Sequence, residues 1–181
     1  MELWCQPPEM DDLLRAVGDH AEITGFRAMS GASGSRPLIV MTTTGFLGGP
    51  ELRRHCHEQG TVADFDTLTV DDVVLDLLSP DELSKLVTNS SEGAFSRFVT
   101  PEGDLETQLV TMWESLLDFT PIGVLDDFVE LGGESMSALE IVVQVSQRWG
   151  RDLNLVDVVD AACIRNLARL ITASPANADE T

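Results

Sequence analysis

The chain has 181 residues, enough for one medium domain or two small ones, and 43% of them are hydrophobic, which is enough for packed cores. No apolar run approaches the roughly 20 residues of a membrane-spanning helix, and the N-terminus lacks the basic start and apolar stretch of a secretory signal, so we expect a soluble protein in the cytoplasm. The 31 acidic residues against 11 basic ones give a net charge of −20, which disfavours nucleic acid and anionic membranes as partners and favours proteins with basic surfaces.

The first half of the chain alternates between helical and extended patterns. Apolar residues recur at helical spacing before Gly18, and a second helix is bracketed by Pro50 near its start and Gly60 past its end. Two apolar stretches typical of strands lie between them, joined by a flexible run of Ser and Gly. In chain order, the predicted elements are a helix at 8–20, strands at 23–29 and 37–42, a helix at 51–59, an extended segment at 67–76 and a short segment of helical character that begins at 80–83. These elements predict an α+β domain, a small sheet flanked by helices.

The second half of the chain differs in character. Residues 88–104 have the composition of a connector, with Asn, Ser, Gly, Thr and Pro and little periodicity. Beyond it we predict helices at 105–117, with Asp104 able to cap the start, at 135–149, ended by Gly150, at 153–159 and at 164–171. In the second of these helices, the apolar residues at helical spacing are Leu139, Val142, Val143 and Val145. The prediction is an all-α bundle of four helices.

These changes of pattern predict the domain organisation. The expected ranges are 1–87 for the α+β domain, 88–103 for a linker, 104–174 for the helical domain and 175–181 for a polar tail.

The cysteines give no sign of a disulfide framework or a metal site. Cys5, Cys56 and Cys163 are scattered, odd in number and without metal-ligand spacing. His55, Cys56 and His57 are consecutive on a predicted helix and should point in different directions, which disfavours a metal site or a Cys/His catalytic pair. We expect ordinary thiols, no metal and no catalytic residue.

A glycine pair precedes the helix at 135–149. Gly132 and Gly133 free the backbone before the helix start, so the side chain of Ser135 can project outwards. A phosphodiester on Ser135 would sit at the N-terminus of the helix, where the helix dipole favours negative charge by about 0.3 to 1 kcal/mol. Taken alone, however, Ser135 could simply be a helix N-cap.

The residues around Ser135 resemble a known attachment signature. Residues 126–139, Asp-Asp-Phe-Val-Glu-Leu-Gly-Gly-Glu-Ser-Met-Ser-Ala-Leu, are similar to the motif of peptidyl carrier proteins (thiolation domains) from nonribosomal peptide synthetases. The resemblance covers about 102–173, with Ile-Gly-Val at 122–124 and Ile-Arg-Asn-Leu-Ala at 164–168. It implies a four-helix bundle in which Ser135 is esterified by 4'-phosphopantetheine from coenzyme A through a phosphopantetheinyl transferase.

The resemblance also implies the role and the partners of the chain. Such a domain holds an aminoacyl or acyl group as a thioester at the end of the arm and performs no catalysis itself. Its expected partners are the transferase, an adenylation or other acyl-loading enzyme, and downstream condensation or tailoring enzymes of antibiotic biosynthesis.

Some residues near the signature bear on those partners. Glu134 departs from the family, which often has His or Asp there, and this change could alter which enzymes dock without blocking modification. Met136, Leu155 and Val156 are candidates for a docking patch, and equally for core positions.

The first hundred residues resemble the small C-terminal subdomain of adenylation domains. The pieces that carry this resemblance, in the family's order, lie at 7–14, 21–23, 37–40, 48–53 and 73–76. That family has a lysine that assists adenylate formation, whereas here Lys85 is displaced and Leu83 stands in its place. The chain also contains no phosphate-cradling G-x-x-x-x-G-K-[ST] loop, and the large nucleotide-binding subdomain is absent. We therefore expect no independent adenylation activity.

Three interpretations of the whole chain remain open at this point. In the first, the N-terminal domain is a non-catalytic docking or structural element beside a carrier that works in trans. In the second, it completes the active site of an adenylating partner, with Lys85 or with no lysine. In the third, the helical domain is never modified and serves only as an interaction scaffold.

Overall fold

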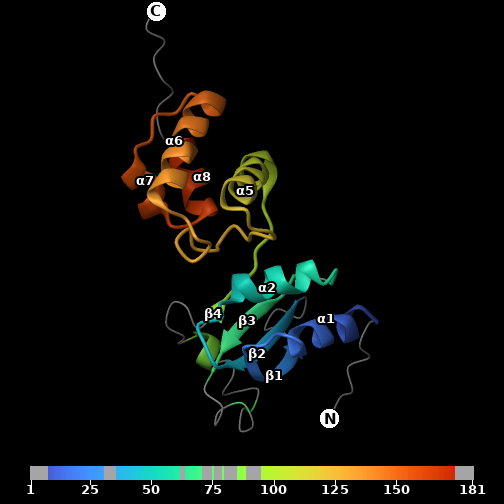
Figure 1. Cartoon of the computed structure of the whole chain (residues 1–181). Coiled ribbons are helices and arrows are strands. Elements are labelled where there is room, and N and C mark those ends of the chain that lie inside the picture. Colours follow the sequence, from blue (N-terminus) through green and yellow to red (C-terminus); the bar gives the residue numbers. More distant parts are fainter. Residues whose placement is uncertain are drawn as a thin grey trace, which may run out of the picture. The chain divides into compact units, whose positions relative to one another are not determined.

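The computed structural model describes residues 8–30, 36–61, 64–70, 75, 79, 85–88 and 95–173. The chain forms two compact units, residues 1–97 and 98–181, and each is described by itself. Figure 1 shows the elements of both units. Within the described ranges, no helix combines the length and the apolar character needed to cross a membrane.

The first unit is a small mixed sheet with two helices. Its elements are α1 (Pro8–Gly18), β1 (Ile23–Ser30), β2 (Pro37–Thr43), α2 (Gly49–Glu58), β3 (Asp66–Thr69) and β4 (Phe95–Ser96). The strand order is β1-β2-β3-β4, in which β2 and β3 are parallel and the other two pairs are antiparallel. The helix α2 makes the crossover between the two parallel strands. This arrangement confirms the predicted α+β character.

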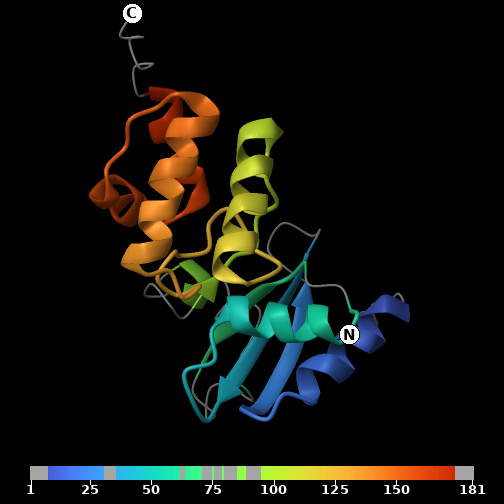
Figure 2. The ribbon, with the colours of Figure 1, turned by 45° about the horizontal axis from the view of Figure 1, so that its top comes forward.

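Both helices pack on the same face of the sheet, as Figure 2 shows. Alternate residues of β2 supply the two faces: Ile39 and Met41 pack with the helices, and Leu38 and Val40 pack on the opposite side. All four side chains are buried. A strand that is buried on both faces has a continuous apolar sequence, which explains the run at 38–41.

The predicted extended segment at 67–76 is too long. The strand β3 spans only Asp66–Thr69, because its partner β2 pairs with it only from Leu38 to Met41. Leu75 lies outside any strand and packs against the far face of the sheet. Alternation in a sequence does not reveal the length of the partner strand, so the end of β3 was not predictable from it. The segment predicted at 80–83 falls outside the described residues.

The predicted linker at 88–103 contains a short strand, and the boundary between the two units also falls within it. Phe95 and Ser96 form β4 and pair with Leu68 and Thr67 of β3. Immediately after them, Phe98 is buried in the second unit. Polar composition suggested a connector, but Phe95 packs against the core on the far face of the sheet and Phe98 is buried. The other predicted boundaries stay predictions.

The second unit is helical. Between Phe98 and Ala173, all of which are described, the helices are α5 (Gly103–Leu117), α6 (Ser135–Trp149), α7 (Leu155–Ala161) and α8 (Ile164–Ala173). Their shared core contains Trp113 and Phe128, whose rings meet edge to face with centroids 5.1 Å apart. The N-cap of α5 is Glu102 and not Asp104, which lies in the first turn. The carboxylate of Glu106 accepts the Glu102 N–H at 2.7 Å, so a side chain in the first turn of α5 satisfies the backbone of its N-cap residue.

Only part of the apolar set at helical spacing on α6 is buried. Ala138, Ile141 and Val145 are buried, whereas Leu139 and Val143 are 48% and 41% exposed. Apolar residues surround more of this helix than the core can cover, so spacing alone could not identify the buried side.

Candidate functional site

The loop before α6, residues 122–134, is held by two aspartates with separate roles, and we call it the attachment loop. The carboxylate of Asp126 is buried and its Oδ2 accepts the Gly123 N–H at 2.8 Å. The Oδ1 atom of Asp127 accepts the N–H groups of Val129 at 2.8 Å and Glu130 at 3.1 Å, which closes a turn of the kind that aspartate favours. The Asp-Asp pair therefore shapes the loop that precedes the helix.

The glycine pair brings the loop onto Phe128. Gly132 has a φ of 86°, in the left-handed region that favours glycine. The Gly133 N–H donates to the Phe128 carbonyl oxygen at 2.8 Å, and a Cβ at residue 133 would lie 2.6 Å from Cδ1 and Cε1 of the Phe128 ring. The phenylalanine is held in turn by its own N–H, which donates to the Ala162 carbonyl at 2.7 Å. Only glycine fits this approach.

Ser135 is the first residue of α6 and its side chain is exposed. The N-cap is Glu134, with extended backbone angles of φ −124° and ψ 172°, so the alternative that Ser135 is merely the N-cap is wrong. Among the residues that the structure describes, the Ser135 hydroxyl has no hydrogen-bond partner. A hydroxyl that is exposed and unoccupied is accessible to an incoming enzyme.

A second serine, which the sequence interpretation missed, contacts the N-cap. Ser137 Oγ accepts the Glu134 N–H at 2.9 Å and donates to the Glu134 carbonyl at 2.8 Å. The signal that could have found it is a polar side chain three residues after the cap, which is the spacing of a capping box.

The charges near Ser135 are negative. Along the chain they come from Asp127, Glu130 and Glu134, and the first basic side chain after Ser135 is Arg148, in the last turn of α6. The start of α6 carries the positive end of the helix dipole, which favours a phosphate there. The residues present therefore fit a phosphodiester at Ser135, while the surrounding side chains favour a basic partner.

Exposed apolar side chains follow Ser135 along α6 and recur on α7. Met136, Leu139 and Val143 are three and four residues apart and share one face of α6, with Met136 75% exposed. We call these three residues the α6 stripe. On α7, Val156 is 58% exposed. Of the three candidates for a docking patch, Met136 and Val156 lie at the surface, and Leu155 packs against the core.

Of the other residues considered from the sequence, Cys163 is buried in the second unit, Cys5 falls outside the described residues, and the rest lie in the first unit. Cys56 is fully buried, and burial raises the pKa of its thiol to about 11, so it is a poor nucleophile at neutral pH. His55 Nε2 donates to the Ala16 carbonyl at 3.1 Å, whereas His57 is exposed. Lys85 is exposed in a helical stretch at 85–88, and Leu83 falls outside the described residues.

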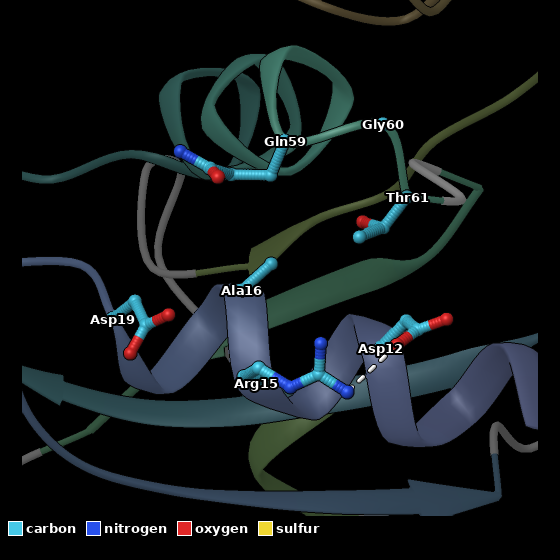
Figure 3. Close-up of a pocket in the computed structure, with 7 residues that line it drawn as sticks. All are labelled: Asp12, Arg15, Ala16, Asp19, Gln59, Gly60 and Thr61. Atoms are coloured by element: carbon cyan, nitrogen blue, oxygen red, sulfur yellow. Dashed lines mark hydrogen bonds and ion pairs between the residues drawn. The ribbon is translucent and has the colours of Figure 1, made fainter.

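A polar hollow of about 240 Å³ lies between α1 and the end of α2 (Figure 3). Its lining residues are Asp12, Arg15, Ala16, Asp19, Gln59, Gly60 and Thr61. The guanidinium of Arg15 bonds Asp12 at 2.8 Å, and both side chains are largely exposed. This lining holds no nucleophile beside a base.

Comparison with known proteins shows that part of the second unit is similar to a known family. Residues 107–171 match the family described as phosphopantetheine attachment site. Tyrocidine synthase 2 from Brevibacillus parabrevis is 44% identical over 77 residues, which are 42% of this chain and 2% of the synthase. Gramicidin S synthase 2 from Brevibacillus brevis is 35% identical over 79 residues, which are 44% of this chain and 2% of that protein. The chain thus spans about 2% of the length of these relatives.

A solved structure is also similar to part of the chain. It is described as the phosphopantetheine transferase Sfp in complex with coenzyme A and a peptidyl carrier protein. The matched chain is 29% identical with a TM-score of 0.41, and the match covers 41% of this chain and 97% of that one.

Proposed function

We propose that this chain, whose second unit is a peptidyl carrier domain of the nonribosomal peptide synthetase type, carries its prosthetic arm on Ser135. The match of residues 107–171 to the attachment family supports the carrier role. The observation that carries the residue assignment is the free, exposed hydroxyl of Ser135 at the start of α6. A carrier domain is not itself catalytic. We infer that its helices form the four-helix bundle of such domains.

The residues of the loop and of α6 have distinct tasks in this function. When attached, the arm supplies a terminal thiol that carries an aminoacyl or acyl group as a thioester. Ser135 Oγ forms a bond to the phosphorus of coenzyme A that bears the pantetheine group, the pyrophosphate bond breaks so that adenosine 3',5'-bisphosphate leaves, and the hydroxyl proton passes to a base of the transferase. The contact of Gly133 with Phe128 fixes the backbone before the serine, and the N-terminus of α6 stabilises the phosphodiester.

The surface around Ser135 is suited to bind partners that have a basic, partly apolar face. The α6 stripe offers exposed apolar area beside the attachment point, and Glu130 and Glu134 add negative charge. Interfaces of this kind use apolar contact for affinity and charge for steering. We propose the phosphopantetheinyl transferase, an acyl-loading enzyme and downstream condensation or tailoring enzymes as the partners. Such a pathway fits a cytoplasmic location, which stays a prediction.

For the first unit, we propose a non-catalytic role as a docking or structural element with no adenylation activity of its own. The alternative is that it completes the active site of an adenylating partner. The exposed position of Lys85 leaves that alternative open to a direct test. Loss of partner-dependent adenylate formation in Lys85→Ala would support the alternative, and unchanged activity would remove the lysine from it.

The attachment is tested by intact-protein mass spectrometry. The full chain is incubated with coenzyme A, magnesium and a broad-specificity phosphopantetheinyl transferase. We expect one added phosphopantetheinyl group on the native chain and on Ser115→Ala, an exposed serine of α5 that serves as a matched control, and none on Ser135→Ala. No addition to the native chain would instead support an unmodified scaffold.

A further inference from the structure

We infer that Ser137 is a positioning residue for the modification of Ser135, because it binds the N-cap of α6 and leaves the neighbouring hydroxyl free. This inference rests on the proposed function of Ser135. It concerns a residue that will carry no arm and will touch no reacting atom.

The first step of the argument is the bonding of Glu134. Its N–H donates to Ser137 Oγ, and its carbonyl oxygen accepts both the Ser137 hydroxyl at 2.8 Å and the Ala138 N–H at 2.9 Å. The hydrogen-bonding groups on both sides of the Glu134 Cα are therefore occupied from within α6. The residue directly before Ser135 has little freedom to rotate.

The second step concerns the residue one further back. Gly133 is held against Phe128 by the hydrogen bond to its carbonyl and by the close approach of the ring. Phe128 is buried. Two consecutive residues before the attachment point are thus fixed, one by the core and the other by Ser137, and together they set the direction of the Ser135 Cα–Cβ bond.

The third step is the contrast between the hydrogen bonding of the two serines. A serine at a helix start commonly uses its hydroxyl to bond the backbone of the first turn. Here Ser137 Oγ bonds the N–H and the carbonyl of the N-cap residue Glu134, and Ser135 Oγ makes no hydrogen bond among the described residues. A nucleophile that starts unbonded and in a fixed direction reacts without first breaking a local hydrogen bond.

Replacement of Ser137 should therefore slow the modification while the domain still folds. Ser137 is only half-buried and Glu134 is exposed, so water can replace the lost hydroxyl. The loss of order is therefore confined to the first turn of α6. We expect Ser137→Ala to lower kcat/KM for the transferase about fivefold, through kcat. Ser137→Thr keeps a hydroxyl at the same atom and should restore the native rate to within about twofold.

The experiment measures two quantities on the full chain. One is the rate of phosphopantetheine addition at varied concentrations of the chain, and the other is the amide hydrogen exchange of Glu134. Exchange of this amide should become about tenfold faster in Ser137→Ala and return to the native value in Ser137→Thr. Thr111→Ala, which removes a hydroxyl that bonds its own helix backbone in α5, is the control and should change neither quantity.

Several results would overturn the inference. One is a native kcat in Ser137→Ala despite faster exchange at Glu134. A loss that appears only in KM would make Ser137 a contact for the transferase instead, and a loss that threonine fails to rescue would exclude the hydroxyl. If the native chain itself accepts no arm, the failure is that of the proposed function, and the exchange data still report whether Ser137 holds the cap.

Discussion

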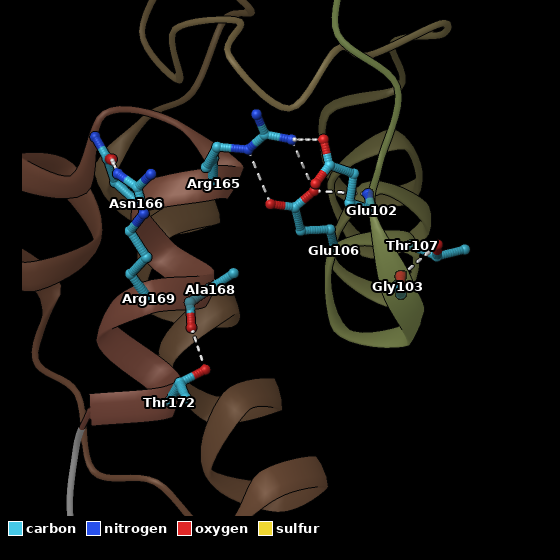
Figure 4. Close-up of polar contacts among 9 residues, drawn as sticks. All are labelled: Glu102, Gly103, Glu106, Thr107, Arg165, Asn166, Ala168, Arg169 and Thr172. Carbon is cyan, nitrogen blue, oxygen red and sulfur yellow. Dashed lines mark hydrogen bonds and ion pairs between the residues drawn. The ribbon is translucent and has the colours of Figure 1, made fainter.

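Arg165 at the start of α8 binds Glu106 of α5 through two hydrogen bonds, from Nε to Oε1 at 3.0 Å and from Nη2 to Oε2 at 3.3 Å (Figure 4). The same guanidinium reaches Glu102 at 3.2 Å, and Glu106 also accepts the Glu102 N–H. The Arg165 N–H donates to the Val124 carbonyl at 3.0 Å. This cluster joins the first helix of the second unit to its last one and to the loop that follows α5.

Loss of the Glu106 carboxylate should destabilise the second unit. In Glu106→Gln the carboxylate becomes a neutral amide, so the Arg165 guanidinium loses its opposite charge in a half-buried position, which should cost about 1 to 2 kcal/mol. The cost is measured by urea unfolding followed through the fluorescence of Trp113 and Trp149, both of which lie in this unit. Glu140→Gln, an exposed change on α6, should cost less than about 0.5 kcal/mol. Equal midpoints for the two variants would contradict the prediction.

The same pair should make the stability of this unit depend on pH. The hydrogen bond from Arg165 holds the pKa of Glu106 below its usual value of 4.5. The folded state therefore binds the proton less tightly than the unfolded state does, so the stabilisation is complete above the unfolded value and is lost as the pH falls through the folded value. The difference in unfolding free energy between the native chain and Glu106→Gln should be constant above about pH 5 and shrink below it. A difference that stays constant down to pH 3 would argue against the pair.

In the first unit, the pKa of His20 should rise when its neighbour is replaced. Burial and the nearby His55 ring, whose centroid is 4.8 Å away, both lower the pKa of His20 from 6.5. In His55→Gln the second cause disappears, so the ring of His20 should titrate at a higher pH, although still under the influence of burial. The change is read from the proton NMR signals of His20 across pH 5 to 8, with His57→Gln as the control. An unchanged titration in His55→Gln would show that His55 does not contribute to the lowered pKa of His20.

A methyl group at residue 133 should disrupt the attachment loop. The Cβ of Gly133→Ala would press on the buried Phe128 ring and its carbonyl, and overpacking of this kind costs about 1 to 3 kcal/mol. A smaller side chain at residue 128 should relieve part of this overlap. The double variant Gly133→Ala with Phe128→Leu should therefore lose less unfolding free energy than the sum of the two single changes. Thermal unfolding of the four chains tests this double-mutant cycle. Strict additivity would mean that the two residues do not press on each other.

The α6 stripe should contribute to binding of the transferase without contributing to stability. Met136→Glu places a charge in the centre of the proposed contact and should raise KM for phosphopantetheine addition about fivefold or more. Leu170→Glu, on α8 and 38% exposed, is the matched control and should leave KM unchanged. Both variants should unfold within about 0.5 kcal/mol of the native chain. Equal KM values for both variants would place the contact elsewhere.

Local signals in the sequence were enough for much of this fold. Pro50, Gly60 and Gly150 start or end a helix through backbone preferences that depend only on residues nearby in the sequence. For this reason α1, α2, α6 and α8 lie close to their predicted ranges. The glycine pair before Ser135 is a signal of the same local kind. The attachment motif could therefore be identified from the order of its residues alone.

Tertiary contacts decided what local signals leave open. The sequence does not show that Phe95 completes the sheet, that Leu139 and Val143 face outwards, or that Arg165 finds Glu106 across the domain. Each of these depends on a partner distant along the chain, and burial is settled only when two elements meet. For the same reason, the attachment motif identifies Ser135 but does not show which hydroxyl bonds the N-cap, and only the folded turn shows that Ser137 does so while Ser135 makes no hydrogen bond among the described residues.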